Sequence, residues 1–224
     1  MASFSGNPHT NDAGLRSVAT SFANAKSGSG TLSVISAAST TTGPQVDAAS
    51  DFTNYYIDRY VMPYDTSSLG SGATVTAGTL DIYINIIDAL PLSGTCYLDL
   101  VAVNLASAPT IATGDWSNVV IGTACATRLS MASGAPGAKQ FVLNASGLAA
   151  VSVTGYTTFA VVMGNDFSNS VSSPSNLSAN SYTYMNCNTS NAGSNKPTLN
   201  LTYTPGVLPG TVRPRRRPLG LYPR

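Results

Sequence analysis

Clustered arginine side chains near the C-terminus are the residues of this sequence with the clearest binding chemistry. Five of the eleven basic residues lie between Thr211 and Arg224, in a segment that also contains three prolines. A guanidinium group forms paired hydrogen bonds with a carboxylate or a phosphate, so this segment suits an acidic protein surface or nucleic acid. Because proline restricts φ and favours extended backbone, we expect an extended arm rather than a helix.

The residues around these arginines help to choose among three interpretations: nucleic-acid binding, a disordered solubilising tail, and docking onto a neighbouring protein. The six other basic residues are outnumbered by ten aspartates, so the body is weakly acidic, which disfavours a nucleic-acid partner. Apolar side chains beside the arginines would contribute nothing in a fully solvated tail. We therefore expect protein docking, through Arg213, Arg215, Arg216, Arg217, Leu219, Leu221, Tyr222 and Arg224.

Catalytic chemistry has little support among the other polar residues. The sole histidine, His9, lies in a Ser/Thr/Ala-rich N-terminal region, so a Ser-His-Asp or Cys-His arrangement would need a mobile base. A glycosidase needs two opposed carboxylates, but strand ends and turns are the ordinary explanation of the aspartates that could supply them. These are Asp58, Asp65, Asp81, Asp88, Asp99 and Asp115. The sequence also lacks a dense calcium-loop pattern, so we predict no metal. We likewise predict no catalytic residue and no cofactor.

Aromatic side chains offer a different binding chemistry, because tyrosine and tryptophan rings can stack against sugar rings. The candidates for glycan stacking are Tyr56, Tyr60, Tyr64 and Trp116. Tyrosines on strands also pack across a sheet. Solvent exposure separates the two roles.

Composition indicates an all-β protein. Glutamate is absent and lysine occurs only at 26, 139 and 196, so the charged residues that favour surface helices are scarce. Valine, isoleucine, tyrosine and threonine form short runs between Gly, Pro, Asn and Ser clusters. Residues 73–87 alternate apolar and polar side chains with period two. We expect strands at 31–36, 55–64, 73–87, 96–105, 119–123, 139–143, 156–163, 181–188 and 198–203, and one short helix that begins after Asn144.

These elements predict a jelly-roll-like antiparallel β-sandwich with one short helix and extended N- and C-terminal arms. Residues 1–50 form a leader or arm with one strand, residues 51–204 the sandwich, and residues 205–224 the Arg/Pro-rich anchoring arm. No apolar run is long enough to span a membrane, and the N-terminus lacks the pattern of a secretory signal. The widely spaced Cys96, Cys125 and Cys187 are expected to be buried free thiols.

Three segments carry a resemblance to a known family. They are Arg59-Tyr-Val-Met-Pro-Tyr-Asp-Thr-Ser-Ser-Leu69, Ala73-Thr-Val-Thr-Ala-Gly-Thr-Leu-Asp-Ile-Tyr83 and Lys196-Pro-Thr-Leu-Asn-Leu-Thr-Tyr-Thr204. Together they resemble the DNRLRE-type β-sandwich domains, which are similar to carbohydrate-binding modules, over residues 51–204. Asp115-Trp116 and Leu143-Asn-Ala-Ser-Gly-Leu148 add a likeness to phage virion proteins that use this sandwich. The six-residue motif after which the family is named is absent from this sequence.

The resemblance implies a non-enzymatic phage virion structural protein. We expect a capsid decoration or head-fibre protein whose C-terminal arm anchors it to other virion proteins, in a homo-oligomer or a larger assembly. The alternative is a secreted or tail-fibre module for carbohydrate binding or adhesion, which would bind a host-surface glycan and act outside the cell.

Overall fold

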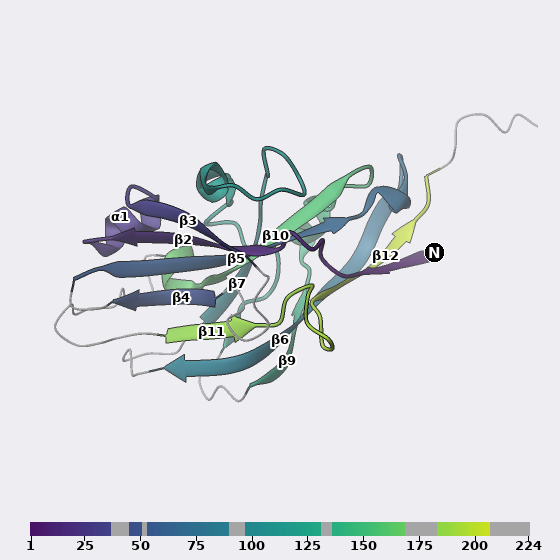
Figure 1. Cartoon of the computed structure of the whole chain (residues 1–224). Helices are drawn as coiled ribbons and strands as arrows, with labels where there is room; N and C mark the ends of the chain where they lie inside the picture. Colours follow the sequence, from purple (N-terminus) through teal and green to yellow (C-terminus); the bar gives the residue numbers. More distant parts are fainter. Residues whose placement is uncertain (37–44, 51–52, 90–96, 131–135, 169–182, 207–224) are drawn as a thin grey trace, which may run out of the picture.

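The computed structural model describes residues 1–36, 45–50, 53–89, 97–130, 136–168 and 183–206 (Figure 1). Its strands are β1 (Ala2–Gly6), β2 (Ala13–Ala19), β3 (Thr31–Ser36), β4 (Gln45–Ser50), β5 (Tyr55–Asp65), β6 (Thr74–Ala89), β7 (Tyr97–Ala102), β8 (Leu129–Ser130), β9 (Gly137–Val142), β10 (Tyr156–Met163), β11 (Thr183–Cys187) and β12 (Thr198–Thr204). The helices are α1 (Phe22–Ser27), α2 (Ala145–Ala149) and α3 (Gly164–Phe167), and 3-10 turns form η1 (Ser67–Leu69) and η2 (Thr113–Asn118).

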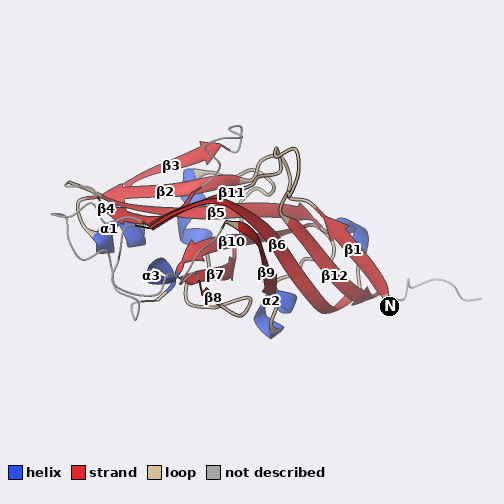
Figure 2. Ribbon diagram, turned by 90° about the horizontal axis from the view of Figure 1, so that it is seen from below, coloured by secondary structure: helices blue, strands red, loops and turns tan. Residues whose placement is uncertain are grey.

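The described strands pair antiparallel and form a sandwich of two layers (Figure 2). Hydrogen bonding follows the order β1-β12-β6-β11-β4-β5-β10-β7-β8, while β2 pairs with β5 and β3, and β9 pairs with β6. The long strand β5 connects the layers, because its first half pairs with β4 and its second half with β10. The predicted all-β sandwich is therefore confirmed.

Two hydrophobic clusters lie on opposite faces of β5. Tyr60, Met62 and Tyr64 point into the main core, which they share with leucines and isoleucines of β6, β7 and β12 and with aromatic residues of β9 and β10. Ile57 and Val61 point the other way, into a second cluster that α1 and η2 cover. This division follows from the period-two alternation of a strand. A strand that is buried on both faces positions polar groups in both clusters.

The helical cover over the second cluster begins and ends at recognisable capping residues. The Ser21 side chain accepts a hydrogen bond from Asn24 N at the start of α1, and Gly28 ends the helix with φ of 76°. A side chain at Gly28 would be strained by that left-handed φ and would also meet the Trp116 ring, 2.3 Å from the ideal Cβ position. Glycine here lets α1 close onto the indole.

Most predicted strands are present, with ends that differ by a few residues. The segment 31–36 is β3 without change, and the predicted helix after Asn144 is α2, with the Asn144 side chain accepting from Gly147 N. The Asp65 turn is also confirmed, since Asp65 accepts from Ser67 N and Oγ. Residues 119–123 do not form the predicted strand, and Val119 makes only an isolated bridge to Val103.

The prediction that residues 1–50 form a leader or arm with one strand is wrong for the described residues of this region. They contribute β1, β2, α1, β3 and β4, with Leu15 of β2 buried in the second cluster. These strands are rich in Ser, Ala and Gly, which have little intrinsic preference for β structure. Pairing with β12 and β5 overrides that weak local preference.

Candidate functional site

The predicted partner-binding arm lies outside the described residues. This applies to Arg213, Arg215, Arg216, Arg217, Leu219, Leu221, Tyr222 and Arg224. The described chain ends at Gly206, just beyond β12. A side chain at Gly206 would stand 2.3 Å from Ser71 O, so the backbone there packs closely against the turn before β6. The arm therefore starts from a defined point on the sandwich.

Three of the four predicted glycan-stacking residues are buried. Tyr60 and Tyr64 are fully enclosed in the main core, and Trp116 is covered in the second cluster. The prediction that these rings stack on a sugar is wrong, because the strand face that carries the tyrosines is the inner face of the sandwich. Tyr56 is half-buried, with the Arg16 guanidinium carbon 5.8 Å from its ring centre, and remains a prediction.

Tyr60 also bonds to a buried carboxylate. Its hydroxyl donates to Asp12 Oδ2 at 2.5 Å, and Ser190 donates to the same carboxylate through its backbone N and its Oγ. Burial and the nearby Asp12 charge raise the pKa of Tyr60 well above its ordinary value. This network joins the loop after β1 to the loop after β11, and it is structural.

Asp58 is a buried carboxylate at the outer end of the main core. Arg16 of β2, directly opposite on the neighbouring strand, donates from Nε to Asp58 Oδ1 at 2.7 Å and from Nη2 to Oδ2. Burial raises the pKa of Asp58, while the hydrogen bonds and charge of Arg16 lower it. Asp47 of β4 stands at the facing register position on the other side. Arg16 therefore compensates a carboxylate that sits in an unfavourable place.

A second ion pair lies under the helical cover. Arg59 donates to both carboxylate oxygens of Asp166, at 2.7 and 2.9 Å, and both side chains are buried. The remaining donors of Arg59 bond to the carbonyl oxygens of Trp116 and Lys26, and its guanidinium carbon lies 3.6 Å from the centre of the Trp116 ring. This arrangement engages all three guanidinium nitrogens and ties β5 to α1, η2 and α3.

The other buried aspartates are also engaged. Arg128 donates to Asp99, while the carboxylate of Asp115 accepts from the backbone of Ala106 and Ala112. The candidate catalytic residues Asp58, Asp99 and Asp115 are therefore held in separate ion pairs or turns. Asp88 lies in a part of β6 whose side chains are not described. The described residues do not bring together two opposed carboxylates in an open cleft.

The two described cysteines, Cys125 and Cys187, are buried free thiols, as predicted. Cys96 lies outside the described residues. Complete burial raises the pKa of Cys187 to about 12. Because the thiolate is the reactive form, such a thiol should react slowly with alkylating reagents at neutral pH.

Cys187 should thus resist iodoacetamide at pH 8 in the folded protein and react rapidly in urea. Peptide mass spectrometry at Cys187 measures this, and the same peptide from urea-treated protein is the control. Equal labelling with and without urea would show that Cys187 is accessible in the native fold.

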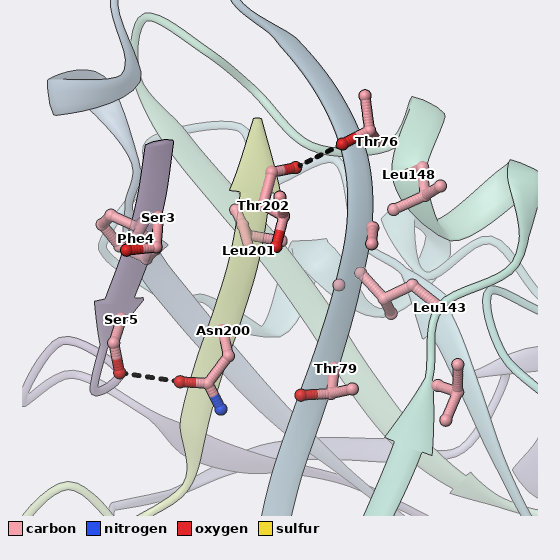
Figure 3. A pocket seen from close by; sticks show the side chains of 13 residues that line it. Ser3, Phe4, Ser5, Thr76, Thr79, Leu143, Leu148, Asn200, Leu201 and Thr202 are labelled. Carbon is pink, nitrogen blue, oxygen red and sulfur yellow. Dashed lines mark hydrogen bonds between the residues drawn. The ribbon is translucent and has the colours of Figure 1, made fainter. Parts of the chain in front are cut away.

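An open groove of about 430 Å³ crosses β1, β12 and β6 and ends beside α2 (Figure 3). The end towards β1 is mixed: Ser5 Oγ donates to Asn200 Oδ1 and Thr76 Oγ1 donates to Thr202 O, while Phe4 and Leu201 also line it. The other end is apolar and is lined by Val142, Leu143 and Leu148. Val142 is 57% exposed, which is unusual for a large apolar side chain of this fold.

The shape of the groove depends on where strands stop. β9 pairs with β6 only as far as Thr79, whereas β6 extends to Thr74. Gly78 forms part of the lining, and a side chain there would approach Leu143 and Leu201 to 2.8 Å. After Val142 the chain turns into α2, so Leu148 faces β6 across the space that β9 leaves. The sequence pattern does not predict this groove. The groove exists because β9 ends before β6 does, and the turn into α2 determines where β9 ends.

Comparisons with known proteins leave the fold and the geometry to carry the functional argument. No protein-family model matches the chain, and the search of curated proteins finds no match. Among the described residues, no three or more His, Cys or Asp side chains are grouped where they could hold a metal ion. None of the described helices has the length and hydropathy needed to cross a membrane.

Proposed function

We propose that this chain is a non-enzymatic structural protein of a phage particle. Its β-sandwich is displayed on the virion, and its C-terminal arm anchors it to neighbouring virion proteins. Within this class, capsid decoration or a head fibre is the first assignment. The resemblance of residues 51–204 to sandwich domains of virion proteins and the sandwich fold both support the proposal.

The contrast between the paired arginines of the weakly acidic body and the clustered arginines of the arm carries the proposal. Arg16, Arg59 and Arg128 of the body each pair with a buried aspartate. The segment from Thr211 to Arg224 has five arginines and no acidic residue within it. A run of guanidinium groups with leucines and a tyrosine beside it suits an acidic, partly apolar protein surface. This distribution of arginines favours anchoring by the arm.

The carbohydrate-binding alternative rested on exposed aromatic rings. Three of its four candidate residues are enclosed in the sandwich or under α1 and η2. The buried aspartates that a glycosidase would need hold structural ion pairs and turns instead. Nothing in the described surface favours either role over arm-mediated assembly.

Deletion of residues 207–224 tests the proposal. The truncation keeps every described contact, including the packing of Gly206 against the turn before β6, so we expect a folded sandwich with a nearly unchanged unfolding midpoint. The amount of protein in purified phage particles, measured by quantitative mass spectrometry, should fall to background. Incorporation at the level of the full chain would overturn the anchoring function.

A further inference from the structure

The apolar end of the groove between β6 and α2 has the features of a peptide-binding site. We propose that it receives residues 219–222 of the C-terminal arm from a second copy of this chain. This inference rests on the proposed function, because it names the surface that the anchoring arm binds. The occupant is an extended peptide, and the subunits exchange arms.

Backbone pairing is the first reason for an extended peptide. Residues 74–77 of β6 continue beyond its last backbone contacts with the β9 segment, which are the pair of Thr79 with Val142 and the hydrogen bond from Leu143 N to Gly78 O. Within the described part of the chain, no strand pairs with that stretch on the β9 side. A strand added there would continue the line of β9 and pair with the sheet edge.

Side-chain alternation is the second reason. In an extended segment Leu219 and Leu221 point to the same side, with Gly220 between them. The apolar contacts of the groove gather at its α2 end, from Val142, Leu143 and Leu148, and Leu201 of β12 also lines it. Two leucines on one face match this lining, and the intervening glycine lets the segment lie close to its walls. An extended peptide can make these contacts in an open groove.

Charge supports the same placement. Asp81 is on the outer face of β6, two residues from Thr79 of the groove lining, and its carboxylate accepts hydrogen bonds from the amides of Gln140 and Asn200. Among the described residues it forms no ion pair. Arg217 precedes Leu219 by the same spacing of two residues. An arm that runs over β9 towards α2 would bring Arg217 to Asp81 as Leu219 enters the groove.

The length of the arm favours the groove of another subunit. From Gly206 to Leu219, an extended proline-rich segment spans about 40 Å at roughly 3.1 Å per residue. Gly206 packs beside Gly72, and a strand brings Thr76 within about 14 Å of Gly72. An extended arm therefore overshoots the groove of its own subunit, and five prolines between 205 and 223 oppose a sharp reversal.

Photo-crosslinking of the full-length chain tests this site. The photoreactive residue p-benzoylphenylalanine replaces Tyr222, and equal amounts of light and isotopically heavy protein are mixed before irradiation. We expect crosslinks to residues of the groove lining in mixed light–heavy pairs, as arm exchange requires. Crosslinks within single chains only, crosslinks to another surface, or no crosslinks would each overturn the inference.

Matched substitutions locate the site further. Val142→Arg places a bulky cation in the apolar end of the groove and should lower the crosslink yield at least about tenfold, because an apolar contact is lost and arginines then repel. Val34→Arg is the control, since Val34 of β3 is also an exposed valine and is not part of the groove lining. Equal yields for the two variants would contradict the inference.

Particle incorporation separates this inference from the proposed function. If deletion of residues 207–224 abolishes incorporation while Val142→Arg leaves it intact, the arm anchors the protein at another surface. The proposed function then stands and the groove assignment fails. Loss of incorporation in both variants, with normal incorporation of Val34→Arg, supports both.

Discussion

Arg59→Met should lower the free energy of unfolding by about 3–5 kcal/mol, the usual cost of leaving one partner of a buried ion pair without the other. The substitution leaves the Asp166 carboxylate buried and removes the bonds from Arg59 to the carbonyl oxygens of Trp116 and Lys26. A loss of this size is a large share of the stability of an ordinary domain. Urea unfolding measures it.

Fluorescence adds a local measurement, because Trp116 is the only tryptophan in the chain. The stacking of Arg59 on its ring should be lost in the variant, and the native emission spectrum should change. The double variant Arg59→Met/Asp166→Leu is the control, since it removes both charges and should recover part of the loss. An effect below about 1 kcal/mol for Arg59→Met would show that this pair does not hold the cover in place.

Arg16→Met should cost about 3 kcal/mol, at the low end of the range for buried pairs, because the Arg16 side chain is 28% exposed. Removing Arg16 leaves the Asp58 carboxyl fully buried without its partner. Urea unfolding of the variant and the parent at pH 7 measures the difference. A double variant, Arg16→Met/Asp58→Asn, keeps the loss of the arginine but removes the buried charge, so it should be more stable than the single variant.

The pH dependence of the Arg16→Met variant has a defined sign. Burial raises the pKa of Asp58, and the hydrogen bonds and charge of Arg16 oppose this rise. The variant lacks that opposing effect. A carboxyl whose pKa is higher in the folded state than in the unfolded chain binds a proton more tightly when folded. The variant should therefore recover stability relative to the parent as the pH falls from 7 through the folded pKa of Asp58. The recovery should be complete below 3.8, the ordinary pKa of an aspartate in an unfolded chain.

The parent protein is the proper reference for this titration. Hydrogen bonds from Ser67 lower the pKa of Asp65, so Asp65 alone makes both proteins less stable as the pH falls. The difference between variant and parent isolates Asp58. A stability difference that stays constant between pH 7 and pH 4 would contradict the assignment. The Arg16→Met/Asp58→Asn double variant lacks the titrating carboxyl, so it should show no recovery relative to the parent as the pH falls.

The sequence predicted the sandwich because strong local patterns coincide with its central strands. Period-two alternation placed Leu80, Ile82 and Ile84 on one face of β6, and these side chains are in the main core. β1, β2 and β4 were missed because their Ser/Ala-rich sequences become strands through pairing with β12, β5 and β11, which lie far along the chain. Local propensity carries no information about those partners.

The candidate site shows the same division between local and tertiary information. Alternation placed Tyr60 and Tyr64 on one face, but it did not determine that this face points inwards. The aspartates were recognised as titratable groups, yet their arginine partners on other elements depend on register and packing. The arm was found from its composition alone, since clustered charge and proline need no tertiary context to be recognised.

The central claim is that the arginines of the C-terminal arm anchor the sandwich to a phage particle. The most direct measurement is a mixed assembly, in which the full chain competes with a variant that has Arg213, Arg215, Arg216 and Arg217 replaced by serine. Mass spectrometry of purified particles gives the ratio of the two proteins, normalised to their ratio in the soluble extract. We predict strong depletion of the serine variant from the particles, whereas an equal ratio in particles and extract would contradict the account.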